Sequence, residues 1–296
     1  MLAIVGTIPE PDFPLVDGTV SYQGGVMEVE GRRIPVNRGT PALVAAAIRS
    51  SEVLLLPPPH VCLVGDIGPG KGSRSLYRHL TGRLGNRDFS VLTFHYLQPD
   101  VDWHNRVLFA IEDMPERPIL IADAGFMYAA KMSGQSGAYD LFTPDVGELA
   151  FLADETAPHP FYTRGFILHE ENRVPDLIAR AYEYDNAARV LLVKGAQDYV
   201  ADRTGILATV NTGSEEAMEA IGGTGDTLTG IVSALIASGM DVGEAAVAAA
   251  EANRLAGHYA RPTPATQVLE IVEQIPGALR EVLEKREDRG DLRCVR

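Results

Sequence analysis

Short apolar segments and amphipathic segments alternate through most of the chain, and this alternation restricts the fold more than any other feature. Apolar runs bounded by Gly, Pro or Asp are typical of buried parallel strands, and they lie at residues 60–64, 90–96, 119–122, 141–143 and 190–193. Helical patterns precede or separate these runs, at residues 41–50, 73–84, 103–111, 147–153 and 175–186. Because strand–helix–strand units build layered sheets, we expect a three-layer α/β fold with a mainly parallel central sheet.

The two ends of the chain differ from this central pattern. Alternating residues at 19–22 and 26–30 flank Gly24-Gly25, which is typical of a β-hairpin. We therefore expect residues 1–37 to form a small β appendage and residues 38–286 to form one α/β domain. Its last part contains helical patterns at 227–238, 242–259 and 267–286, and residues 287–296 read as a charged, frayed tail.

Composition excludes several classes of function. The formal net charge is −14, so the surface repels nucleic-acid backbones and anionic lipid headgroups. No apolar stretch approaches the roughly 18–20 residues that span a bilayer, and the N-terminus lacks the basic region of a signal peptide. The two cysteines, Cys62 and Cys294, form neither a disulfide framework nor a zinc pattern. We expect a cytoplasmic homo-oligomer that takes a small-molecule substrate, without a nucleic-acid or membrane partner.

The most informative segment is the glycine turn, residues 222–226, with the sequence Gly-Gly-Thr-Gly-Asp. Glycines let the backbone approach a ligand closely, and successive amides at a helix start form an anion site. Asp226, which ends the turn, can cap the following helix or accept a proton from a substrate hydroxyl. Read alone, the segment is equally compatible with a capped helix after a flexible turn.

The sequence from Gly223 to Gly230 resembles the Gly-Thr-Gly-Asp-x-Leu-x-Gly signature of ADP/ATP-dependent NAD(P)H-hydrate dehydratases in the ribokinase-like superfamily. Residues 121–124, 142–148, 190–195 and 255–276 resemble further segments of that family in the same order. The resemblance covers roughly residues 119–280. It implies a ribokinase-like nucleotide-binding catalytic domain over residues 38–286 that uses ATP or ADP together with Mg²⁺.

The resemblance also implies roles for individual residues. Asp226 would be the catalytic base, and Asp145 with Glu148 would bind Mg²⁺, although Asp145 also reads as a simple helix N-cap. Phosphate and nucleotide contacts would come from Lys194, Gly195, Gly222, Gly223, Thr224, Gly225 and Asn253, and Asp123 would lie on the substrate side.

Three segments depart from the family pattern, all on the substrate side of the site. The family's His-Pro is Asp145-Val146 here, its Asn after the Asp-Ala strand is Phe126, and its Met-Ala-Thr is Glu219-Ala220-Ile221. Asp145 brings the chain closer to the metal slot of ribokinase-like kinases. The nucleotide half of the site is therefore better supported than the nicotinamide half.

A second glycine-rich segment, residues 65–73, nearly matches a P-loop in the right strand–loop–helix context, but Gly72 replaces the hydroxyl residue that would bind magnesium. In ribokinase-like folds such an early turn lines the acceptor side. We therefore expect Gly70, Lys71 and Ser73 to contact substrate, with a plain strand–helix turn as the alternative. His95 lies at the end of the predicted strand 90–96, which suggests either a substrate contact or a satisfied core histidine.

These observations favour ADP/ATP-dependent dehydration of NAD(P)H hydrate, through phosphoryl transfer followed by elimination. A small-metabolite kinase on the same fold is the first alternative. A catalytically impaired nucleotide-binding regulator and a P-loop NTPase are the others.

Overall fold

The computed structural model describes residues 1–156, 174–213, 215–263 and 265–288. Its centre is a nine-stranded sheet in the order β12-β11-β10-β9-β8-β7-β1-β6-β2. The six strands from β10 to β6 are parallel to their neighbours, whereas β11, β12 and β2 pair antiparallel at the edges. The strands are β1 (Leu2–Ile8), β2 (Val16–Thr19), β6 (His60–Gly65), β7 (Val91–His95), β8 (Ile119–Asp123), β9 (Leu141–Phe142), β10 (Val190–Val193), β11 (Asp198–Asp202) and β12 (Gly205–Val210).

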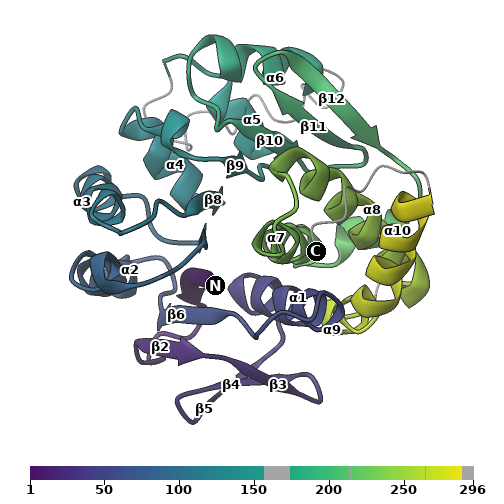
Figure 1. Ribbon diagram of the computed structural model, residues 1–296, viewed down its shortest axis with the longest axis horizontal. Coiled ribbons are helices and arrows are strands. Elements are labelled where there is room, and N and C mark those ends of the chain that lie inside the picture. Colours follow the sequence, from purple (N-terminus) through teal and green to yellow (C-terminus); the bar gives the residue numbers. More distant parts are fainter. Residues whose placement is uncertain (157–173, 214, 264, 289–296) are drawn as a thin grey trace.

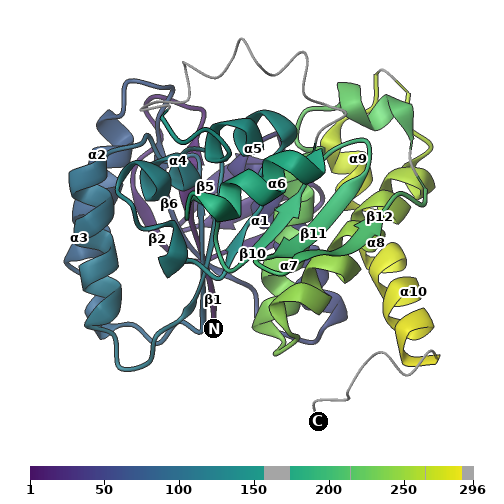
Figure 2. The same ribbon diagram turned by 90° about the horizontal axis from the view of Figure 1, so that it is seen from above.

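Helices cover both faces of this sheet, each over its own hydrophobic cluster. One layer consists of α1 (Thr40–Val53), α7 (Thr224–Ala237), α8 (Val242–Ala260), α9 (Val268–Val272) and α10 (Ile275–Asp288). The other consists of α2 (Lys71–Thr81), α3 (Val101–Glu112), α4 (Gly125–Met132), α5 (Val146–Leu152) and α6 (Val174–Glu183). Both views separate α2 and α3 from α8 and α10 (Figures 1 and 2). The predicted three-layer α/β fold is confirmed.

Short 3₁₀ helices occur at η1 (Leu84–Asn86), η2 (Ser136–Ala138) and η6 (Glu216–Ala220), and η6 leads into the glycine turn. Within the described residues, no helix is long and apolar enough to cross a membrane.

The predicted N-terminal hairpin is present, but the predicted boundary of the appendage is wrong. Strands β3 (Ser21–Gln23), β4 (Val26–Val29) and β5 (Arg32–Pro35) form a separate antiparallel sheet. The β3–β4 turn has positive φ at Gly24 (57°) and Gly25 (78°), as a tight hairpin turn requires. However, β1 lies between β6 and β7 and is buried along its whole length, so the first strand is a central element of the main sheet. A continuous apolar run is what a parallel strand covered on both faces needs.

The remaining differences from the predicted elements are local. Helix α4 and the antiparallel strands β11 and β12 were not predicted, and the predicted helix 267–286 is divided into α9 and α10. Pro276, at the second position of α10, fits this break because the first turn of a helix does not need its missing N–H. Of the predicted tail, residues 289–296 lie outside the described residues.

Close packing of α1 against α7 joins the N-terminal and C-terminal thirds of the chain. A Cβ atom on Gly230 would lie 2.2 Å from the carbonyl oxygen of Leu43 and 2.9 Å from Cβ of Ala46. Only glycine permits this approach, because any side chain would overlap the α1 backbone. The first residues of α1 and α7 therefore lie beside each other, next to the carboxyl ends of the central strands.

The edge strand β2 is fixed by an ion-pair network around Asp17. One carboxylate oxygen of Asp17 lies 2.5 Å from His60 Nε2, and the other lies 2.7 Å from His79 Nε2 and 2.8 Å from Arg87. The Cys62 thiol also donates to Asp17. Burial by itself would raise the pKa of Asp17, but these hydrogen bonds and the charge of Arg87 hold the pKa well below its usual range. Both oxygens already have two partners, so this cluster stabilises the sheet edge.

We predict that Asp17→Asn lowers the free energy of unfolding at neutral pH by about 3 kcal/mol, because it removes the centre of a largely buried ion-pair network. A group whose folded-state pKa is depressed stabilises the fold above its unfolded pKa, near 3.9, and loses that contribution as pH falls. Urea titrations at several pH values should therefore give the variant a shallower loss of stability below about pH 4 than the wild type. Asp12→Asn, at an exposed position, is the control, and equal acid slopes would contradict the assignment.

Candidate active site

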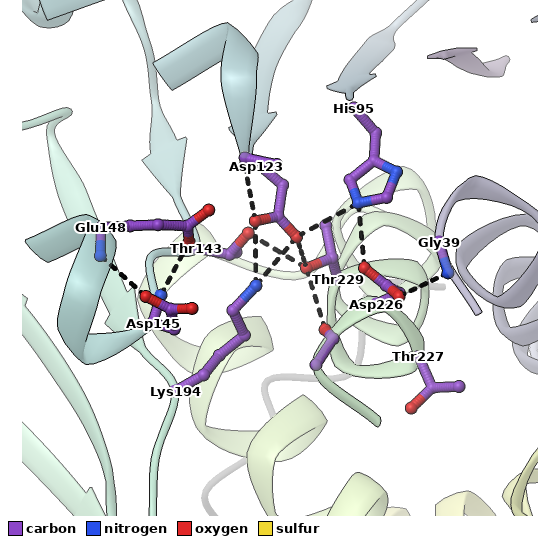
Figure 3. A network of polar contacts seen from close by, with 12 residues as sticks. Gly39, His95, Asp123, Thr143, Asp145, Glu148, Lys194, Asp226, Thr227 and Thr229 are labelled. Carbon is purple, nitrogen blue, oxygen red and sulfur yellow. Dashed lines mark hydrogen bonds and ion pairs between the residues drawn. The ribbon is translucent and has the colours of Figure 1, made fainter. Parts of the chain in front are cut away.

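Polar residues from four elements meet at the carboxyl end of the central strands (Figure 3). His95 ends β7 and Asp123 ends β8, and the two are register partners in the sheet. Lys194 follows the last residue of β10, and Asp226 lies in the first turn of α7. The side chains of His95 and Asp123 are buried, and those of Lys194 and Asp226 are 13% and 12% exposed. In a parallel sheet this edge is the usual position of a ligand site.

The Asp226 carboxylate is held by a backbone amide and an imidazole. Gly39 N–H donates to one oxygen at 2.7 Å, and His95 Nε2 lies 3.0 Å from the other. Because a carboxylate only accepts, we assign the proton to Nε2, and His95 Nδ1 then faces the Thr40 hydroxyl at 2.9 Å. Burial would raise the pKa of Asp226, but the His95 hydrogen bond, the charges of His95 and Lys194, and the Gly39 amide outweigh it and lower that pKa. Asp226 is therefore an ionised proton acceptor at neutral pH.

Asp123 and Lys194 form the second buried charge pair of the site. Lys194 Nζ lies 2.9 and 3.0 Å from the two oxygens of Asp123, which also accept hydrogen bonds from Thr229 Oγ1 (2.6 Å) and the Ala124 amide (2.8 Å). Burial would lower the pKa of Lys194, but the charges of Asp123 and Glu148 raise it above its ordinary value. Asp123 thus orients a permanent ammonium group, and its direct contact with substrate stays a prediction.

The glycine turn has the geometry of an anion-binding helix start. Gly223 has φ of 111°, and no side chain in the described part of the chain caps α7 at this end. A Cβ on Gly223 would lie 3.0 Å from Val268 Cγ2 and 3.1 Å from Arg38 Cα, and one on Gly225 would lie 3.4 Å from Lys194 Cδ. The first amides of a helix lack partners within the helix and carry its positive dipole end. This turn therefore combines free amides with a nearby ammonium group, which suits phosphate.

Asp145 and Glu148 form a capping box at the start of α5, on the other side of Lys194 from Asp226 (Figure 3). Each carboxylate uses one oxygen for the backbone amide of the other residue, at 2.7 and 2.9 Å, which leaves one oxygen on each side chain for a ligand. Burial and the charge of Asp145 raise the pKa of Glu148 well above its ordinary value, against the effect of Lys194. Two hard oxygen donors beside a phosphate site fit Mg²⁺, which keeps waters and takes its other ligands from substrate phosphates.

Two predicted nucleotide contacts have partners within the protein. Asn253 is buried, accepts a hydrogen bond from Thr227 Oγ1 (2.7 Å) and donates to the carbonyl of Thr224 (3.0 Å). It therefore braces the glycine turn from α8, and its contact with adenine stays a prediction. Gly195 is exposed beside Lys194, and its carbonyl accepts from Arg254 at 2.9 Å.

The second glycine-rich loop closes on a carboxylate of its own. Asp66 accepts hydrogen bonds from the amides of Gly68, Gly70 and Ser73 at 2.8–3.1 Å. The Ser73 hydroxyl donates to Asp66 as well, whereas Lys71 is exposed. A phosphate bound as in a P-loop would have to displace this carboxylate from the amides. The arrangement disfavours a P-loop, and substrate contacts of Gly70, Lys71 and Ser73 stay predictions.

Sequence reasoning missed several residues of the site. Gly39 and Thr40 were not candidates, because nothing in their local sequence relates them to a segment almost two hundred residues away. Thr229 had a usable signal, since it lies three residues after Asp226 and so on the same face of α7. Asp66 also had a usable sequence signal, because an aspartate two residues before a glycine often accepts hydrogen bonds from the following backbone amides.

Comparison with known proteins adds independent evidence on family. Residues 100–276 match the model of the NAD(P)H-hydrate dehydratase family. The protein MJ1337 of Methanocaldococcus jannaschii is 40% identical over 242 residues, which are 81% of this chain and 100% of that protein. The bifunctional NAD(P)H-hydrate repair enzyme Nnr of Pyrobaculum aerophilum is 30% identical over 301 residues, covering 93% of this chain but 57% of the enzyme.

Among solved structures, the ADP/ATP-dependent NAD(P)H-hydrate dehydratase of Bacillus subtilis, co-crystallised with ATP and Mg²⁺, superposes with a TM-score of 0.56. The alignment covers 95% of this chain and 89% of that one at 13% identity. A ribokinase-like superfamily protein of Enterococcus faecalis gives a TM-score of 0.57 at 16% identity, over 95% and 87% of the two chains. These likenesses establish the ribokinase-like fold. Together with the match over residues 100–276, they show that the chain belongs to the NAD(P)H-hydrate dehydratase family.

Proposed function

We propose that this protein dehydrates hydrated NAD(P)H in a reaction that consumes ATP or ADP and requires Mg²⁺. The observation that carries the proposal is the ionised Asp226 carboxylate, held by Gly39 and His95 in the first turn of a helix that begins with the glycine turn. This arrangement places a proton acceptor directly beside an anion site. Phosphoryl transfer to a hydroxyl group needs these two features together.

In the first step, the substrate hydroxyl oxygen attacks the terminal phosphorus of the nucleotide. The bond from phosphorus to the nucleotide breaks, its electron pair leaves with the nucleotide, and the hydroxyl proton passes to Asp226. The amides of the glycine turn and the Lys194 ammonium stabilise the charge on the transferred group. Mg²⁺ held by Asp145 and Glu148 would neutralise further phosphate charge.

In the second step, elimination restores the dihydropyridine ring. The carbon–oxygen bond breaks with its electron pair leaving on phosphate, and the neighbouring carbon releases a proton to water as the double bond forms. A kinase on the same fold would use the same residues and stop after the first step, so the two functions differ in the fate of the phosphorylated product. A cytoplasmic location and assembly into a homo-oligomer stay predictions.

The proposal predicts that purified protein, given NADH hydrate, Mg²⁺ and ATP or ADP, restores the absorbance of reduced nicotinamide. Omission of nucleotide or metal should abolish this recovery. A phosphorylated hydrate that accumulates without recovery would indicate a kinase. Nucleotide binding without turnover would indicate a regulator, and either result would reject dehydration.

We predict that Asp226→Asn lowers kcat on the order of 10²–10⁴-fold, because the amide cannot accept the hydroxyl proton. Nucleotide affinity, measured by calorimetry, should change far less, since the amides of the glycine turn remain. Asp102→Asn, at an exposed position of α3, is the matched control. Full turnover by Asp226→Asn would exclude this carboxylate as the base.

His95 is expected to act through Asp226 as a positioning residue. Its hydrogen bond lowers the pKa of Asp226, so His95→Ala should raise that pKa and move the acid limb of the kcat/KM profile to higher pH. Thr40→Val, which removes only the hydroxyl facing Nδ1, should produce a smaller shift in the same direction and protects the test against misfolding of the first variant. Unchanged profiles in both folded variants would limit His95 to core packing.

A further inference from the structure

Arg38 lies across the start of the glycine turn, although it is remote from that turn in sequence. A Cβ atom on Gly222 would sit 3.0 Å from Arg38 Cδ and 3.5 Å from Arg38 Cβ, and a Cβ atom on Gly223 would sit 3.1 Å from Arg38 Cα. The two glycines therefore make room for the arginine. The aliphatic part of Arg38 therefore packs against Gly222, which directly precedes Gly223, the N-cap of α7.

The next residue links Arg38 to the proton acceptor. Gly39 N–H donates to Asp226 at 2.7 Å, so the backbone at Arg38 is fixed relative to that carboxylate. Close packing of α1 on α7 at Gly230 holds both segments in this register. The Arg38 side chain thereby lies against the start of the glycine turn, one residue before the amide that holds Asp226.

Arg38 is exposed, and within the described residues its guanidinium has no ion pair or hydrogen bond. Some arginines of the chain pair with carboxylates, for example Arg87 with Asp17 and Arg254 with Asp198, whereas others, such as Arg32, have no ion pair within the described residues. Arg38 differs from the other arginines without an ion pair in its position against Gly222 and Gly223. A planar guanidinium matches phosphate oxygens better than an ammonium does.

We propose that Arg38 binds the phosphoryl group during its transfer and is a further catalytic residue of this site. The inference rests on the proposed function. Arg38 would neutralise charge on the equatorial oxygens while the bond to the nucleotide breaks, and afterwards on the phosphate that leaves in the elimination. Lys194 approaches the turn from the Gly225 side, so the two cations would flank one anion. Arg38 lies outside residues 100–276, so it is contributed by the N-terminal part of the chain.

The test compares Arg38→Gln and Arg38→Lys with Arg32→Gln, a control at an exposed arginine of β5 in the small sheet. Arg38→Gln should lower kcat on the order of 10²–10³-fold with little change in KM for the hydrate, as expected for charge stabilisation specific to the transition state. Arg38→Lys should fall between Arg38→Gln and the wild type, because an ammonium keeps the charge but not the paired donors. Added guanidinium ion should partly restore the activity of Arg38→Ala. Because the Arg38 side chain is exposed and has no partner within the described residues, its substitution should change the melting temperature little.

A second readout separates this inference from the proposed function. Inorganic phosphate and pyrophosphate are titrated by calorimetry into wild type and Arg38→Gln, and the variant should bind both about tenfold more weakly, the loss expected for one charge-assisted contact. If the wild type fails to dehydrate the hydrate but shows this difference, the proposed function fails while the anion contact stands. Wild-type kcat together with wild-type phosphate affinity in Arg38→Gln would reject the role of Arg38. A wild type that neither turns over nor binds phosphate would reject both.

Discussion

The contact between the Gly39 amide and the Asp226 carboxylate is the constraint on which the rest of the site depends. Gly39 is the N-cap of α1, and Asp226 lies in the first turn of α7, in the last third of the chain. Their meeting requires α1 and α7 to pack with almost no space between them, and Gly230 permits this. Any larger residue there would separate the two helix starts and remove both the amide and Arg38 from the neighbourhood of Asp226.

The site also holds two buried carboxylates close to each other. Asp123 and Asp226 lie at the same edge of the sheet, and a carboxylate oxygen of each lies near His95 Nε2, at 3.9 Å for Asp123 and 3.0 Å for Asp226. Two buried carboxylates would raise the pKa of each other unless cations or hydrogen-bond donors compensate them. Lys194 forms an ion pair with Asp123, whereas His95 and Gly39 donate hydrogen bonds to Asp226. This division of partners keeps Asp226 ionised, as its proposed role as a base requires.

Local electrostatics differ from those of the whole molecule. A chain with net charge −14 repels anionic nucleotides at long range, so attraction must arise at short range. In the proposed function, backbone amides at the start of α7 would provide this attraction without any side-chain charge, and Lys194, whose pKa is raised, would add one cation. The proposed Mg²⁺ site at Asp145 and Glu148 agrees with this arrangement, because a divalent cation between carboxylates and phosphate offsets the repulsion between their negative charges.

Sequence by itself determined the layered α/β fold, since hydrophobic periodicity is a local property that sheet and helix burial impose on every segment. It also determined the glycine turn with Asp226, because closely spaced glycines before a helix have a direct meaning for the backbone. Tertiary structure alone decided that β1 is a central strand and that Asp66 occupies the amides of the second glycine-rich loop. It also decided that Gly39 and His95 hold Asp226 while Thr40 faces His95. These contacts join positions up to 187 residues apart. They follow from how α1, α7 and the strand ends pack in three dimensions, which no spacing along the chain encodes.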